Sequence, residues 1–262
     1  MRTLTRTVGR KSMGGEPLPS CFSIFEKLQI VFRRSELTMI AAEPGTGKSM
    51  LALAIALKTG VPTLYFAADT SAHTMAMRLA SMVSGKPQSE TEHLLETDPG
   101  WTRAVLPAGE HIKWAFDSDP SIEGIVLECK AFEELWGTPP HMIIVDNISD
   151  IAGEGGEEYA TLKAINKELK ILAREKNAAI IALHHTSESV PGTPCQPRSA
   201  ILGKIAQVPA MILTLGVDGT HLASAVVKNR YGKADKNGAN VMAWLDFFPE
   251  FCYVNDINEV PQ

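Results

Sequence analysis

The stretch AEPGTGKS at residues 42–49 constrains the fold of this chain more than any other segment. It matches the phosphate-binding pattern G-x-x-x-x-G-K-[ST] at every fixed position except the first, where Ala42 replaces glycine. Gly45 and Gly47 let the backbone curl so that successive N–H groups point at one anion, whereas Pro44 has no N–H to offer. The apolar run ELTMIAA precedes the loop and the helix-forming run SMLALAIALK follows it. A bound phosphate would therefore lie at a helix N-terminus.

This placement between a strand and a helix favours a triphosphate site over a Gly-Pro turn that precedes Lys-Ser by chance. The Lys48 ammonium would reach the β- and γ-phosphates, and the Ser49 hydroxyl would hold Mg²⁺. The residues expected to surround the phosphates are Glu43, Pro44, Gly45, Thr46, Gly47, Lys48, Ser49 and Met50.

The composition fits one α/β domain, because 262 residues that are 45% hydrophobic and 21% charged can bury one sizeable core. We expect a basic arm at residues 1–20 and the domain at residues 21–262. No apolar run approaches the length of a membrane span and no secretory signal begins the chain, so a cytoplasmic protein without a membrane partner is expected. The four cysteines lie far apart without a C-x-x-C pair, which predicts reduced thiols and no zinc site.

The charge is unevenly distributed along the chain. Residues 1–34 carry seven basic groups against two acidic ones, a net of +5. Residues 85–160 carry sixteen acidic groups against four basic ones, a net of −12. Such an acidic surface repels nucleic acid, so contact with DNA or RNA should be confined to a few loops or to the arm.

Buried-strand runs alternate with helical runs along most of the chain, which predicts a mostly parallel central sheet flanked by helices and ending in an antiparallel hairpin. Residues 85–110 are expected to form loops around one short helix, and acidic residues 151–158 and Pro-rich residues 187–199 are expected to be flexible loops. The strands are expected at residues 36–42, 61–69, 111–117, 142–147, 178–185, 209–216, 221–229 and 237–248. The helices are expected at residues 22–28, 49–58, 70–83, 122–137 and 159–177.

Two carboxylates close buried strands, where an open α/β sheet places its ligands. Asp146 ends MIIVD and would hold Mg²⁺, although an aspartate at this point could also cap the next turn. Asp69 ends the run at residues 61–69 and could polarise water towards a γ-phosphate. A helix N-cap is the alternative for Asp69.

Two basic pairs follow other strands. His184 and His185 are adjacent, so their side chains point to opposite faces of the strand and only one can face the nucleotide. Lys228 and Arg230 lie two residues apart, which places both cations on one face of a strand. They are either solvated edge charges or a phosphate clamp offered to an adjacent subunit, and the spacing leaves both interpretations open.

Taken in order, the segments resemble the core of RecA-type ATPases, and more closely that of DnaB-like replicative helicases, including compact plasmid RepA-like helicases. The resemblance covers about residues 20–247. It rests on LTMIAAEPGTGKS, TLYFAADTSAHTMAMRLAS, FDSDPSIEGI, MIIVDN, IIALHHTSE and VVKNRYG.

The resemblance implies a role for each matching residue. Asp69 stands where the family has a catalytic glutamate, one methylene longer, and Asp146 is in the place of the metal aspartate. His185 is in the place of a γ-phosphate sensor that is often glutamine. Lys228 and Arg230 match K-x-R-x-G, a pair that acts on the site of a neighbouring subunit.

The implied function is an ATP- and Mg²⁺-dependent translocase or helicase, working as a ring of identical chains, expected to be hexameric, on single-stranded or forked DNA in replication. Its channel loops would lie near residues 153–158, which are acidic, and 187–204, which carry only Arg198 and Lys204 as basic residues. Two alternatives stay open on the same core. One is a structure-specific DNA nuclease, and the other is a recombination mediator or regulatory ATPase.

Overall fold

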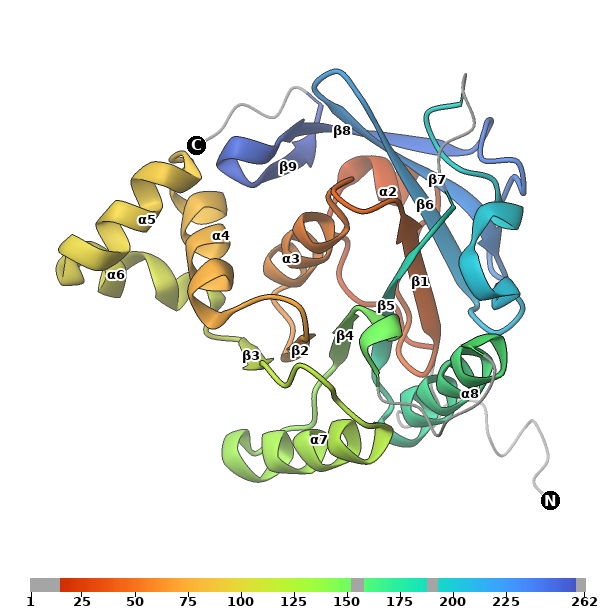
Figure 1. Cartoon of the computed structure of the whole chain (residues 1–262), viewed down its shortest axis with the longest axis horizontal. Coiled ribbons are helices and arrows are strands. Elements are labelled where there is room, and N and C mark those ends of the chain that lie inside the picture. The colour runs from red at the N-terminus through yellow and green to blue at the C-terminus, as the bar shows by residue number, and fades with distance from the viewer. Residues whose placement is uncertain (1–14, 152–157, 188–192, 258–262) are drawn as a thin grey trace.

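The computed structural model describes residues 15–151, 158–187 and 193–257, and the fold is stated for these residues. They form a nine-stranded sheet in the order β3-β2-β4-β5-β1-β6-β7-β8-β9 (Figure 1). Strands β3 to β6 of this order run parallel, and β7, β8 and β9 add antiparallel to one side. The strands are β1 Leu37–Ala42, β2 Thr63–Ala67, β3 Ile112–Ala115, β4 Met142–Asp146, β5 Ala179–His185, β6 Met211–Asp218, β7 His221–Asn229, β8 Met242–Phe248 and β9 Tyr253–Asp256.

Helices cover both faces of the sheet. Helices α2, α3 and α4 pack on one face, and α7 and α8 pack on the other (Figure 1). Strand β1 shows the consequence, since Ile40 points to the first layer and Met39 to the second, and all its residues are buried. The helices are α2 Ser23–Lys27, α3 Lys48–Thr59, α4 Ala72–Ser84, α5 Gln88–Thr97, α6 Pro99–Val105, α7 Ile122–Trp136 and α8 Glu158–Lys176. Short 3₁₀ turns are η1 Leu106–Gly109, η2 Ile148–Asp150, η3 Arg198–Ala200, η4 Leu202–Lys204 and η5 Pro249–Phe251.

The architecture confirms the predicted α/β fold with a mostly parallel sheet and antiparallel C-terminal strands. Helices end where the sequence places glycine: Gly60, Gly85 and Gly137 all adopt the left-handed conformation after the last helical turn. None of the helices in the described ranges is both long enough and apolar enough to cross a membrane.

The prediction for residues 85–110 was wrong, because this segment forms α5, α6 and η1 rather than loops around one short helix. Pro87 is the residue before α5, and Asp98 caps α6 by accepting the N–H groups of Gly100 and Trp101. Pro99 then occupies the first turn of α6. The prolines and glycines of this segment therefore begin helices, a position that tolerates them as well as a loop does.

The described end of the predicted arm, residues 15–20, was expected to be poorly packed but pairs with the domain. The Leu18 N–H donates to the Phe32 carbonyl at 2.8 Å, and the Arg34 N–H donates to the Glu16 carbonyl at 2.9 Å. Leu18 is buried. The rest of the arm, residues 1–14, and the acidic loop at residues 152–157 lie outside the described residues.

Candidate nucleotide site

The phosphate-binding loop has the conformation that its glycines predict. Gly45 and Gly47 have φ angles of +79° and +101°. Helix α3 begins directly after Gly47 without a side-chain cap, so the N–H groups of its first turn are available to an anion. A Cβ atom on Gly47 would lie 2.7 Å from Cζ of Phe247 in β8. Backbone conformation and packing therefore both require glycine there.

Lys48 points its ammonium group into the loop. Its Nζ atom donates to the carbonyls of Ala42 at 3.0 Å and Glu43 at 2.9 Å. The Thr46 hydroxyl also donates to the Glu43 carbonyl, at 2.9 Å. Burial lowers the pKa of Lys48, while the nearby Asp146 carboxylate acts in the opposite direction. The loop carbonyls thus hold the Lys48 side chain, which is only 7% exposed.

Asp146 ends β4 beside the loop and is buried. It accepts a hydrogen bond from the Tyr65 hydroxyl at 2.9 Å and another from Ser49. Burial raises the pKa of Asp146. The next turn is capped instead by Asn147, whose side chain accepts the Ser149 N–H at 2.9 Å. The capping alternative for Asp146 was therefore wrong, and the two predicted metal ligands lie together.

Asp69 follows β2 and is exposed at the rim of the same site. Its Oδ1 atom accepts the Thr70 hydroxyl at 2.9 Å. Helix α4 is capped by Ser71, whose hydroxyl accepts the Thr74 N–H at 3.2 Å. The N-cap alternative for Asp69 was thus wrong as well, which leaves its carboxylate facing the cavity.

The two histidines face opposite sides of β5, as the alternation of a strand predicts. The Nδ1 atom of His185 lies 3.5 Å from Lys48 Nζ, in the nucleotide site. His184 is buried on the other face, with Nε2 3.1 Å from the Leu202 carbonyl. Burial lowers the pKa of His184 to about 4, so this side chain is neutral at physiological pH.

These side chains surround one cavity of about 330 Å³. Of the predicted residues, the cavity brings together the loop, Asp69, Asp146 and His185. It also includes Arg78, which the sequence analysis missed although Arg78 is the only lysine or arginine between residues 69 and 85. The lining residues are Pro44, Gly45, Gly47, Lys48, Ser49, Met50, Asp69, Thr70, Arg78, Asp146, Asn147 and His185.

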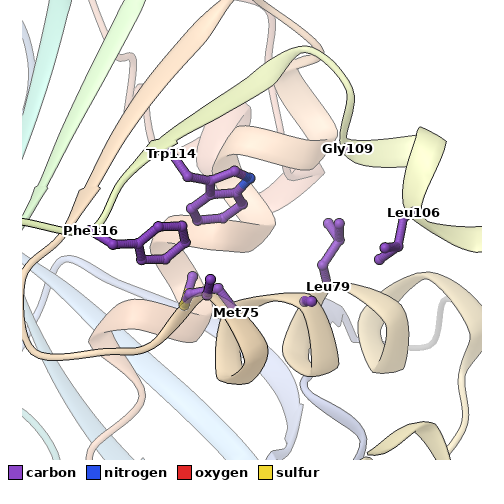
Figure 2. Close-up of a pocket in the computed structure, with 8 residues that line it drawn as sticks. Met75, Leu79, Leu106, Gly109, Trp114 and Phe116 are labelled. Carbon is purple, nitrogen blue, oxygen red and sulfur yellow. The ribbon is translucent and has the colours of Figure 1, made fainter. Parts of the chain in front are cut away.

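A second cavity, of about 250 Å³, has a different character. Figure 2 shows Trp114 and Phe116 on one side of it and Met75 and Leu79 on the other. None of the described residues that line it is charged. The residues that line this cavity offer no charged partner to a triphosphate. Helix α4 therefore contributes to two different cavities, with Arg78 at the polar one and Met75 at the apolar one.

Lys228 and Arg230 lie at the opposite end of the sheet from the phosphate loop. Asn229 pairs with Met211 at the start of β6, and the Arg230 N–H donates to the Ala210 carbonyl at 2.9 Å. The Ala210 N–H in turn donates to Leu37, the first residue of β1, whereas the loop follows the last residue of β1. The six residues of β1 span about 20 Å, so neither cation reaches the cavity of its own chain.

The two cations differ in their surroundings. The Lys228 ammonium donates to the carbonyls of Ala206 and Gln207, both at 2.8 Å, and burial together with Arg230 lowers the pKa of Lys228 to about 8. Lys228 is therefore partly desolvated rather than fully solvated, and its role as a phosphate clamp stays a prediction. The Arg230 side chain is 43% exposed, with Nη1 3.7 Å from Glu36 Oε1.

The predicted DNA-contacting residues stay a prediction. Arg198 is exposed in η3, and Lys204 ends η4, with its side chain outside the described part of the structure. Of the two predicted channel loops, residues 153–157 and 188–192 lie outside the described residues.

Comparisons with known proteins show what the whole chain is similar to. The family model of the DnaB-like helicase C-terminal domain matches residues 17–197. The Gene 65 protein of Mycobacterium phage L5 is 33% identical, with 98% of this chain and 99% of that protein covered. The replicative DNA helicase DnaB of Geobacillus stearothermophilus is 28% identical over 66% of this chain, but the match covers only 40% of that helicase.

Solved structures show the same fold at low sequence identity. One of them, an isolated ATPase domain, superposes with a TM-score of 0.80 at 16% identity, covering 92% of this chain and 91% of that domain. A DnaB-like replicative helicase, solved in a study of its interactions with primase, gives a TM-score of 0.81 at 15% identity, covering 97% of this chain and 67% of that one.

Proposed function

This chain belongs to the DnaB-like helicase family and is an ATPase, and from this premise we propose that it hydrolyses ATP at the interfaces of a ring of its own copies and moves along single-stranded or forked DNA. The position of Arg230 carries the proposal, since this exposed cation lies about 20 Å from the phosphate loop of its own chain.

Within one chain, the cavity contains the groups that bind and orient a nucleotide. Lys48 and the free N–H groups of α3 would hold the phosphates, and Ser49 and Asp146 offer the oxygen ligands that Mg²⁺ prefers. Bound Mg²⁺ would neutralise charge on the phosphate oxygens. Asp69 would orient and deprotonate the attacking water, and His185 would contact the γ-phosphate from beside Lys48.

The same cavity is short of positive charge for a transition state. Lys48 and Arg78 line it, together with the carboxylates of Asp69 and Asp146. Phosphoryl transfer spreads negative charge over the equatorial oxygens, and an arginine supplied by a neighbour commonly stabilises that charge. Arg230 is the exposed candidate, so hydrolysis would be completed only when two chains meet. We place the chains in a hexameric ring, with Arg198 and Lys204 near the DNA.

Mixing two inactive variants tests the interface. Lys48→Ala chains keep Arg230, and Arg230→Ala chains keep Lys48, so a mixed assembly contains some complete sites. We expect phosphate release from the mixture to exceed that of either variant alone. The double variant Lys48→Ala/Arg230→Ala, mixed with Lys48→Ala, is the matched control and should give no recovery. Absence of recovery in the first mixture would contradict action across an interface.

The output of hydrolysis is tested on labelled forked DNA. A helicase should separate the strands with ATP and Mg²⁺ and fail with Lys48→Ala. Cutting of the fork without ATP would instead support the nuclease alternative. Nucleotide-dependent assembly on DNA without unwinding would support a mediator or regulatory ATPase.

A further inference from the structure

The Arg230 side chain is not free at the sheet edge, because a nearly buried carboxylate lies beside it. Glu36 immediately precedes β1, and its side chain is only 13% exposed. Its backbone is fixed on both sides, since its N–H donates to Arg33 and its carbonyl accepts the Ile180 N–H at 3.0 Å. The carboxylate is therefore anchored to the central strands of the sheet.

Arg230 and Tyr231, which are adjacent in the sequence, both approach one oxygen of the Glu36 carboxylate. The Tyr231 hydroxyl donates to Glu36 Oε1, and Arg230 Nη1 lies 3.7 Å from the same atom. Tyr231 also hydrogen-bonds with Arg230, so its hydroxyl links the two. The Arg33 guanidinium lies over the face of the Tyr231 ring, 5.1 Å from its centre, and this cation–π contact helps to hold the ring in place.

The other carboxylate oxygen, Oε2, is buried and has no hydrogen-bond partner among the described residues. An unpaired buried carboxylate oxygen costs free energy, so the position of Glu36 needs a reason beyond stability. Arginine has five N–H donors, and the contact with Oε1 is made by Nη1 alone. The exposed part of the Arg230 guanidinium can therefore bind a second anion while Nη1 stays beside Glu36.

From this arrangement we propose that Glu36 is a positioning residue for Arg230, which it holds, directly and through Tyr231, in the orientation that meets a phosphate of a neighbouring copy. The inference rests on the proposed function, since it assigns a support to the arginine that acts across the interface. Preorganised charges need no rearrangement when the transition state forms, which gives the carboxylate its effect on rate. Glu36 touches no reacting atom.

Glu36→Gln tests the role with nearly unchanged shape. We expect kcat for ATP to fall about tenfold, as for other small misplacements of a catalytic group, with KM little changed because the nucleotide cavity is intact. Tyr231→Phe should give a smaller fall, since the direct contact survives. Glu128→Gln on the exposed face of α7 makes the same change of charge and should leave kcat unchanged.

Two further measurements separate positioning from a structural effect. In an Arg230→Ala background, Glu36→Gln should cause no further fall, because it acts through the arginine. Mixing Glu36→Gln with Lys48→Ala should recover activity, since the Lys48→Ala chain brings an intact Glu36 and Arg230 to the neighbour. Mixing Glu36→Gln with Arg230→Ala should not.

The outcomes distinguish this inference from the proposed function. If Arg230→Ala hydrolyses ATP like the wild type, the proposed function fails. If Arg230→Ala is inactive but Glu36→Gln keeps full kcat, or if Glu36→Gln lowers the residual rate of Arg230→Ala by the same factor, the positioning role alone is overturned. Should Glu36→Gln fail to fold, Tyr231→Phe decides, because full kcat in that variant would reject the link through its hydroxyl.

Discussion

The two ends of strand β1 present different kinds of site. At the carboxyl end, the loop, Asp146 and His185 converge on a polar cavity. At the other end, the Arg230 side chain is 43% exposed beside Glu36. Under the proposed function, the first end binds the nucleotide within one chain, whereas the second provides a positive charge for a neighbouring copy. On the same proposal, one copy of this protein would contribute to two catalytic sites, the phosphate loop to one and Arg230 to the other.

The strongest test of this contrast is the loss of the Lys48 ammonium. Lys48→Ala removes the side chain that lies within the loop, and we expect ATP hydrolysis to fall by about 10⁴-fold, since charge stabilisation is the main contribution to phosphoryl transfer. Steady-state phosphate release measures the change. Lys130→Ala, at an exposed position on α7, is the control and should match the wild type.

Arg230→Ala should separate binding from hydrolysis. We expect hydrolysis to fall by about 10³-fold, the scale of an arginine supplied across an interface. Affinity for a fluorescent ATP analogue should stay near that of the wild type, because the cavity is distant. A matched loss of affinity would contradict the separation of the two ends. Lys233→Ala, an exposed neighbour in the chain, serves as the control.

The free energy of unfolding should depend on pH through His184, which lies near the carboxyl end of β5. The folded pKa of about 4 is below the ordinary value of 6.5, so the unfolded chain binds a proton more readily. This contribution to stability is complete above pH 6.5 and decreases as the pH falls towards 4, by about 2 kcal/mol between pH 7 and pH 5. Urea unfolding at both pH values measures it. The change in unfolding free energy between pH 7 and pH 5 should be smaller in His184→Asn. An equal change in that variant would show that His184 is not its source.

The smallest expected effect concerns the metal site. Tyr65→Phe removes the hydroxyl that donates to Asp146, and loss of such an outer contact weakens metal affinity by about tenfold. ATP hydrolysis measured against Mg²⁺ concentration should show a higher requirement for the metal with a similar maximal rate. An unchanged Mg²⁺ dependence would show that Ser49 and the strand end alone fix the carboxylate.

Local spacing explains which parts of this molecule the sequence could predict. The loop, Asp146 and His185 belong to short segments in which a strand ends in a polar residue, and the parallel sheet brings those ends together. Asp69 lines the same cavity, but its capping alternative could be removed only by seeing Ser71 accept the Thr74 N–H.

The missed residues depend on contacts between distant segments. Tyr65 reads as one more apolar strand residue until its hydroxyl is seen to reach Asp146, 81 residues later. Glu36 and Tyr231 are 195 residues apart, and neither segment contains a pattern that predicts their hydrogen bond. Helices α5 and α6 were missed for a local reason, since proline and glycine mark helix starts as well as loops.

The contact between Phe247 and Gly47 has a consequence for how the protein is made. The aromatic ring that packs against the phosphate loop comes from β8, 200 residues after Gly47 in the sequence. During synthesis on the ribosome, the loop is therefore without this ring until the residues between Gly47 and Phe247 have been made. Nascent chains should therefore acquire the packed form of this loop only after β8 has emerged.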